Sequence, residues 1–117
     1  SQGGAMTQAA MEAFQAAGRD MVPMTGEANN GFLRCWIDVL DEGFSSVAPS
    51  SPTYQSATAL DTAISALQGK PFEKDDIIIV DPITDDTVKD FYRSDLSDSY
   101  WCYSNLTESK LQELFKK

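Results

Sequence analysis

The side chains best suited to binding chemistry lie in one short segment, residues 25–31, which reads Thr-Gly-Glu-Ala-Asn-Asn-Gly. Glu27, Asn29 and Asn30 offer a carboxylate and two amides, which can form paired hydrogen bonds to the vicinal hydroxyls of a sugar or polyol. The same residue types also suit a plain turn, because glycine tolerates positive φ and asparagine caps helices. Residue type alone leaves ligand contact and simple turn chemistry open, and the turn is the simpler interpretation.

The chain lacks the groups that most enzymes use in catalysis. It contains no histidine, which excludes Ser-His-Asp and Cys-His catalysis and histidine-bound metals. Cys35 and Cys102 have no metal-site spacing, so they are either buried free thiols or one disulfide. The acidic pairs at 75–76 and 85–86 lack the alternating oxygens of a calcium loop, and no glycine-rich phosphate loop is present. We therefore expect no enzymatic activity, no bound metal and no cofactor.

Composition excludes further classes of partner. The 117 residues contain 9 Lys plus Arg and 18 Asp plus Glu, giving a formal net charge of −9. A chain this acidic repels nucleic-acid phosphates and anionic membrane surfaces. Its hydrophobic content of 42% is that of a folded chain, and no apolar run approaches the roughly 20 residues of a membrane-spanning helix.

Apolar periodicity predicts helices that alternate with short strands. Helical stripes cover residues 6–17, 32–40 and 54–67, and a last helix follows Thr107. Short apolar runs at 21–24, 44–48 and 77–80 predict buried strands. This alternation indicates an α/β fold in which parallel sheet layers are flanked by helices. The first helical stripe consists of Met6, Ala9, Ala10, Ala13, Phe14 and Ala17, and Trp36 lies on the second, which favours core packing over stacking on a ligand.

Gln2 stands at the start of the first predicted helix. Three strands make a narrow sheet with open edges, so we expect a further strand before Ser1 and a chain that belongs to a longer protein. In that arrangement Gln2 would lie in a crevice like that of residues 25–31, because ligands bind beyond the carboxyl ends of strands. Otherwise Gln2 is a solvated terminal residue.

Several segments match one family of binding proteins in order and spacing. They are Ala-Phe-Gln-Ala-Ala-Gly-Arg at 13–19, Val-Pro-Met-Thr-Gly-Glu at 22–27, Asn-Gly-Phe at 30–32, the helix at 57–70, Pro-Ile-Thr at 82–84 with Val88, Phe91 and Tyr92, and residues 95–101 with Leu106 and the final helix. Together they resemble the last third of type I periplasmic sugar-binding proteins, the ribose-, galactose- and xylose-binding class that serves ABC importers. The resemblance covers essentially the whole chain.

The resemblance implies a protein of two lobes with the ligand in the cleft between them. Residues 1–48 would belong to the C-terminal lobe and residues 49–81 to the N-terminal lobe, and residues 82–117 would form a return crossing and the C-terminal tail. The chain would cross between the lobes at residues 45–51 and 82–86.

The resemblance also implies a set of polar ligand contacts. Glu27 matches the acidic contact of the family, and Pro49 or Ser50 falls in a crossing segment where the family often has glutamine. The implied ligand contacts are Gln2, Glu27, Asn29, Asn30 and Ser50, with Gly3 as the alternative to Gln2.

The function expected from the resemblance is binding of a sugar or polyol for an ABC importer, without chemistry on the ligand. The expected partners are the sugar, the membrane permease, and either the rest of a longer chain or a second copy that completes the sheets. The expected location is the periplasm, with a signal peptide upstream of this chain.

Two other classes of protein remain open. The effector domain of a sugar-responsive transcription repressor shares the expected fold, but such domains usually lack an extension like the one from Asp95 onward. A free-standing acidic interaction module is the other alternative.

Overall fold

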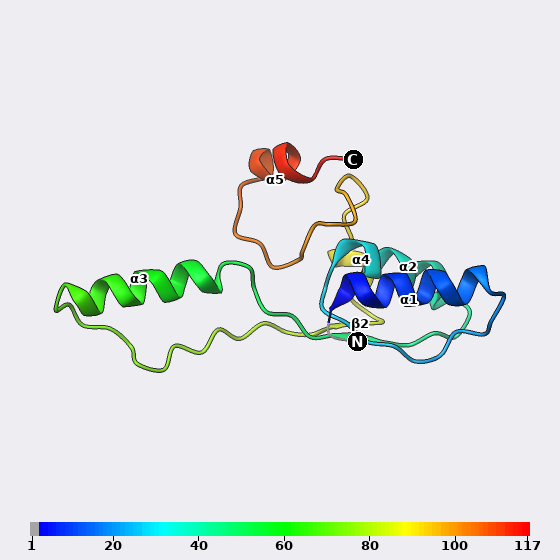
Figure 1. Cartoon of the computed structure of the whole chain (residues 1–117), viewed down its shortest axis with the longest axis horizontal. Coiled ribbons are helices and arrows are strands. Elements are labelled where there is room, and N and C mark those ends of the chain that lie inside the picture. The colour runs from blue at the N-terminus through cyan, green and yellow to red at the C-terminus, as the bar shows by residue number, and fades with distance from the viewer. Residues whose placement is uncertain (1–2) are drawn as a thin grey trace.

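Helices α1 (Gly4–Ala16) and α2 (Asn30–Leu40) pack against each other at one end of the elongated molecule (Figure 1). The computed structural model describes residues 3–117 of the chain. After α2 the chain forms, in order, β1 (Val47–Ala48), α3 (Gln55–Leu67), β2 (Ile83–Thr84), α4 (Val88–Phe91) and α5 (Glu108–Phe115). No helix in this part of the chain is both long and apolar enough to cross a bilayer.

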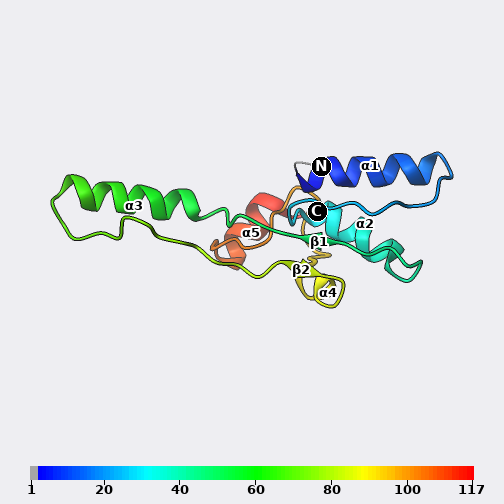
Figure 2. The same cartoon turned by 90° about the horizontal axis from the view of Figure 1, so that it is seen from below.

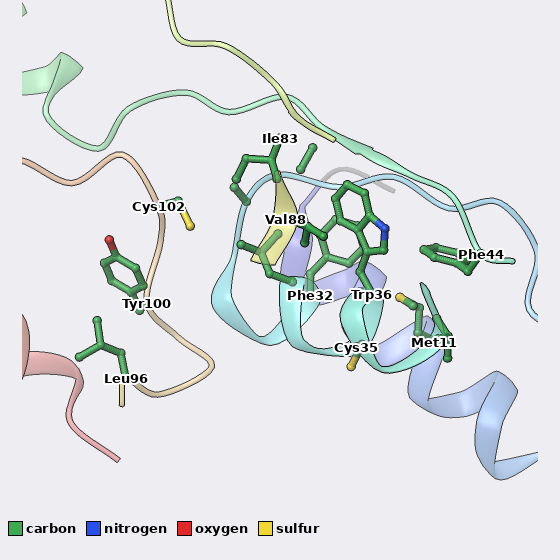
Figure 3. Packing of buried hydrophobic residues seen from close by; sticks show 14 of the residues in the cluster. Met11, Phe32, Cys35, Trp36, Phe44, Ile83, Val88, Leu96, Tyr100 and Cys102 are labelled. Atoms are coloured by element: carbon green, nitrogen blue, oxygen red, sulfur yellow. The ribbon is translucent and has the colours of Figure 1, made fainter. Parts of the chain in front are cut away.

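The hydrophobic core forms around one face of α2, as its apolar stripe predicts. Phe32 and Trp36 are fully buried, and their rings stack with centroids 5.5 Å apart. Figure 3 shows Ile83 and Val88 beside these rings, so residues 83–88 close over α2. The prediction that Trp36 is a core residue is confirmed.

Helix α1 buries a different face from the one predicted. Met6, in the predicted stripe, is 60% exposed, whereas Gly4, Thr7 and Met11 are buried. Glycine decides the orientation, because a Cβ atom at position 4 would lie only 2.1 Å from the carbonyl oxygen of Glu27. The small face of α1 therefore turns inward and allows close packing, which outweighs the burial of the alanine-rich stripe.

The predicted α/β fold with parallel sheet layers is wrong. Helices make up 43% of the structure, and the single sheet within residues 3–117 is an antiparallel pair of two-residue strands. In this pair Val47 lies opposite Thr84 and Ala48 opposite Ile83. The parallel sheet that the alternation indicates, and the periplasmic-binding-protein-like sheets that the resemblance implies, are therefore not formed by the described residues.

The predicted strands at residues 21–24 and 44–48 show why the parallel sheet is absent from the described residues. They run beside each other in the same direction, but side chains link them in place of a backbone ladder. Ser46 Oγ donates to the carbonyl oxygen of Met24 at 2.6 Å, and Thr25 Oγ1 donates to the carbonyl oxygen of Val47. These side-chain bonds hold the two segments together, but no backbone ladder joins them, so they form no parallel sheet.

The third predicted strand, residues 77–80, has no strand beside it in the described chain. Ile77 and Ile79 are 78% and 82% exposed, so the run is extended but unpaired. A β-branched run favours extended backbone, yet a strand also requires the hydrogen-bonding groups of a neighbour.

Residues 49–81 extend away from the packed helices α1 and α2 as an arm that carries α3 (Figures 1 and 2). The molecule measures 59 × 30 × 23 Å, and its radius of gyration is 17.0 Å, whereas about 13 Å is expected for a compact chain of this length. No residue of α3 is buried. The predicted boundaries near residues 48 and 82 lie at the ends of β1 and β2, and the assignment of these parts to two lobes stays a prediction.

Candidate functional site

The loop at residues 25–31 lies against the N-terminal end of α1. Thr7 Oγ1 donates to the carbonyl oxygen of Thr25 at 2.9 Å. A Cβ atom at Gly26 would lie 2.4 Å from Thr7 Oγ1, so glycine is required for this approach. Helix α1 thereby holds the beginning of the loop, just before Glu27.

The segment after β1 holds the middle of the loop. The backbone N–H of Ala28 donates to Ser50 Oγ at 3.2 Å. Of the predicted contacts, Glu27 and Ser50 are thus brought to the same place, although 23 positions separate them in the sequence. Gln2 lies outside the described residues, and its alternative, Gly3, is the N-cap of α1.

Asn29 has a structural role at the start of α2. Its Oδ1 accepts the N–H of Phe32 at 3.3 Å, as an N-cap does, and its Nδ2 donates to the carbonyl oxygen of Asp98 at 2.7 Å. Only 2% of Asn29 is exposed. The turn-and-cap interpretation of this residue describes the geometry, which leaves little of the amide for a ligand.

Asn30 is fully buried and binds backbone instead of solvent. Its Nδ2 donates to the carbonyl oxygens of Arg93 at 2.8 Å, Leu96 at 3.0 Å and Ser97 at 3.2 Å. Its Oδ1 accepts the N–H of Arg93 at 2.9 Å. With no exposed surface, Asn30 has no group to offer a ligand directly.

Glu27 is half-buried, and its carboxylate forms no hydrogen bond or ion pair with any residue that the structure describes. Its backbone is fixed, because the Glu27 carbonyl oxygen accepts the N–H of Asn29 at 2.7 Å. A carboxylate on a fixed backbone, carried by the residue before the one that binds the Ser50 hydroxyl, can accept hydrogen bonds from two adjacent ligand hydroxyls. Of the predicted contacts within residues 3–117, Glu27 and Ser50 retain polar atoms for a ligand.

A shallow groove of about 370 Å³ begins at the Thr25 end of this loop. Its size is near the lower end of ordinary ligand pockets. Its walls are the two extended segments that run beside each other, through Pro23, Met24, Thr25, Ser45, Ser46 and Val47.

A second acidic side chain, that of Asp85, joins the two segments that connect the arm to the core. Its carboxylate accepts the Ser45 hydroxyl, the Ser46 N–H at 3.0 Å and the Trp36 indole N–H at 2.9 Å. These donors, the Ser45 hydroxyl first, lower the pKa of Asp85. From the sequence, residues 85–86 are considered only as a calcium site that lacks the required pattern. The signal for this contact is the tryptophan itself, because a buried indole N–H requires an acceptor.

A second cluster, formed by Gln8, Arg34 and Asp98, joins α1, α2 and the chain after α4. Asp98 Oδ2 accepts Arg34 Nη2 at 2.9 Å and Gln8 Nε2 at 3.0 Å. The hydrogen bond from the Arg34 guanidinium lowers the pKa of the Asp98 carboxyl. From the sequence, no role is assigned to Asp98, whose partner Arg34 lies 64 positions away in the sequence.

The cysteines are buried free thiols. Burial raises the pKa of Cys35 to about 11 and that of Cys102 to about 12, so neither is a reactive thiolate near neutral pH. No group of three or more potential metal ligands occurs among residues 3–117.

Comparison with known proteins does not assign the chain to a family. No family model matches it, and searches of curated proteins and of solved structures returned no similar protein.

Proposed function

We propose that the loop at residues 25–31 and Ser50 contact a sugar or polyol in a protein that binds this solute for an ABC importer. The observation that carries the proposal is the 3.2 Å hydrogen bond from the Ala28 N–H to Ser50 Oγ. It brings the segment leading into the arm to the acidic loop, which is where the resemblance to periplasmic sugar-binding proteins expects ligand contacts from both.

The residues at this place suit capture and release without reaction. The Glu27 carboxylate is available as an acceptor, and the Ser50 hydroxyl has a proton to donate. Asn29 and Asn30 support the backbone of the site and do not contact the ligand, since their amides bind backbone carbonyl oxygens of the protein. Vicinal hydroxyls match this arrangement because each donates and accepts one hydrogen bond within a short distance.

Further polypeptide is part of the proposal. The arm exposes large apolar side chains, and such side chains are usually covered by other polypeptide in a stable protein. Here the cover is either the rest of a longer chain or a second copy. These side chains are Leu60, Ile64, Leu67, Phe72, Ile77 and Ile79. Sugar binding by the 117-residue chain is then weak, because part of the binding surface comes from the covering polypeptide.

The proposal is tested by following backbone amide shifts while D-ribose, D-xylose and D-galactose are added to the chain. We expect one of these sugars to shift the Glu27 and Ala28 signals with a dissociation constant of about 1 mM or weaker. Glu27→Gln then weakens the response at least about tenfold, because a charge-assisted hydrogen bond is lost. The matched control is Glu42→Gln, a change of equal charge at an exposed residue after the end of α2.

Two results would overturn the proposal. One is the absence of any sugar-dependent shift at residues 25–31 and Ser50. The other is an equal response of the Glu27→Gln and Glu42→Gln variants. Micromolar binding by this chain alone would show that no covering polypeptide is needed.

A further inference from the structure

We infer that residues 93–102, here called the tail clamp, fix the position of Glu27, and that Asn30 is the positioning residue through which they do so. The consequence for ligand binding rests on the function proposed above. The mechanical part, which is that the tail clamp sets the backbone beside Glu27, stands on the geometry alone.

Ala28 is the link between the tail clamp and Glu27. Its N–H donates to Ser50 Oγ at 3.2 Å, while its carbonyl oxygen accepts the N–H of Cys102 at 3.0 Å. Hydrogen bonds therefore hold Ala28, the residue next to Glu27, at both its N–H and its carbonyl oxygen. Loss of the bond to Cys102 frees the carbonyl oxygen. Only 1% of Ala28 is exposed, so water does not replace the lost partner easily.

The tail clamp runs antiparallel to the segment that follows Ala28. Asn29 and Trp101 form an isolated antiparallel bridge, and the N–H of Asn30 donates to the carbonyl oxygen of Tyr100 at 2.8 Å. The N–H of Gly31 donates to the carbonyl oxygen of Asp98 at 3.2 Å. These bonds form a short ribbon whose backbone register relative to residues 28–31 is fixed.

Asn30 holds the other end of the tail clamp. Its side-chain amide binds four backbone groups, the carbonyl oxygens of Arg93, Leu96 and Ser97 and the N–H of Arg93, at distances of 2.8 to 3.2 Å. No surface of Asn30 is exposed. One amide thus folds residues 93–97 into the turn from which the ribbon continues to Cys102.

Helices α1 and α2 support the tail clamp from outside. The Asp98 side chain accepts hydrogen bonds from Gln8 of α1 and Arg34 of α2, and a Cβ atom at Gly31 would lie 2.9 Å from Asp98 Cβ. The close approach at glycine leaves no room for the tail clamp to slide. The core therefore fixes the position of the tail clamp, and the tail clamp in turn fixes the backbone of Ala28.

The test is Asn30→Asp in the 117-residue chain. The substitution keeps the shape of the side chain but places a carboxylate against three carbonyl oxygens, which it repels. The control is Asn105→Asp, which adds the same charge at an exposed residue that follows the tail clamp.

Two signals are measured without any ligand. Amide hydrogen exchange at Cys102 reports its bond to Ala28, and the backbone amide shift of Glu27 reports the loop. In Asn30→Asp we expect exchange at Cys102 to become at least about tenfold faster and the Glu27 signal to move, because the tail turn loses its anchor. Exchange at Val39 in α2 stays slow, which separates a local effect from unfolding.

Acid should restore both signals in Asn30→Asp. A buried carboxyl among carbonyl oxygens has a raised pKa, and once protonated it donates a hydrogen bond again. The charged and titratable groups around it keep their state between pH 5 and 8, because the pKa values of the nearby carboxyls are lowered and those of the guanidiniums, thiol and phenol are raised. These groups are Asp95, Asp98 and Glu108, Arg34 and Arg93, and Cys102 and Tyr100.

The same variants are then titrated with D-ribose, D-xylose and D-galactose. If the tail clamp positions Glu27, the sugar-induced shift of the Glu27 signal decreases when the Cys102 amide loses protection from exchange. Both recover at low pH. The inference is overturned if Cys102 protection falls and returns while the ligand-free Glu27 signal stays in place. It is also overturned if Asn30→Asp and Asn105→Asp behave alike.

A milder variant covers the case in which Asn30→Asp unfolds. Asp98→Asn weakens the outer support and is expected to speed Cys102 exchange less while moving the Glu27 signal in the same direction; an unmoved Glu27 signal contradicts the inference. If the variants show the clamp effects but the wild-type chain gives no sugar response, the proposed function fails and the mechanical coupling stands.

Discussion

The indole nitrogen of Trp36 lies 2.9 Å from a carboxylate oxygen of Asp85 and donates a hydrogen bond to it. Trp36 is the largest fully buried side chain, and Asp85 follows directly after β2. The same carboxylate binds the Ser45 hydroxyl and the Ser46 N–H just before β1. One acidic side chain therefore ties both ends of the arm to the core helix α2.

Asp85→Asn should destabilise the protein. The amide replaces one acceptor oxygen with a donor that faces N–H and O–H groups, and an unsatisfied partner of this kind costs about 1–3 kcal/mol. Unfolding by urea, followed by tryptophan fluorescence, measures the change. Asp86→Asn is the control, since Asp86 is exposed and carries the same charge. Equal midpoints for the two variants would contradict the assigned role.

Gly4→Ala should be more harmful than Gly3→Ala. A Cβ atom at Gly4 would meet the Glu27 carbonyl oxygen at 2.1 Å, whereas one at Gly3 would have nothing within 4 Å. Because the obstacle is backbone, α1 must shift, and overpacking of this kind costs about 1–3 kcal/mol. Thermal melting of both variants gives the comparison. Similar melting temperatures would show that α1 does not approach the loop so closely.

The ion pair between Arg34 and Asp98 should stabilise the fold at neutral pH and lose its effect in acid. The hydrogen bond from Arg34 lowers the pKa of Asp98 in the folded state, whereas the unfolded carboxyl titrates near about 3.9. The stabilisation is therefore complete above the unfolded pKa and is lost as the pH falls through the lower, folded pKa. Both side chains are about one-third exposed, so the effect is about 1 kcal/mol or less.

Stability measured from pH 7 down to pH 2 for the wild type and for Asp98→Asn checks this sign. The difference between the two should be largest at pH 7 and shrink below about pH 4. A difference that grows in acid would mean that the pair does not lower the pKa of Asp98.

Cys35 and Cys102 should resist thiol reagents in the native protein and react after denaturation. Both are buried, and burial raises their pKa values to about 11 and about 12, so the nucleophilic thiolate is scarce at pH 8. Ellman's reagent with and without guanidinium measures the rate. Rapid native labelling, or an intact mass that indicates a disulfide, would contradict the structure.

Features that depend on one segment alone followed from the sequence. The stripe of α2, its asparagine cap and the burial of Trp36 follow from local spacing, because a helix satisfies its own backbone. The strands at residues 21–24 and 77–80 did not follow, since a strand depends on a neighbour that the sequence does not identify.

The candidate site divides in the same way. Glu27 was identified by its type and its place beside glycine, and the structure leaves its carboxylate without a partner among the described residues. Asn30 has the same local signal, but its partners begin 63 positions further along the chain. The local sequence pattern carries no information about partners so far away in the chain. It therefore does not distinguish a buried structural residue such as Asn30 from a ligand contact.

The pairing of β1 with β2 has a mechanical consequence for the arm. A single covalent connection would let the arm spin about its bonds, but two strands joined side by side resist torsion and permit mainly bending. Ala48 and Ile83 are both fully buried, which seats this double connection in the core. A force applied near Leu67, at the far end of α3, would therefore act on Trp36 and Asp85 as a bending moment, because the paired strands prevent the arm from rotating freely.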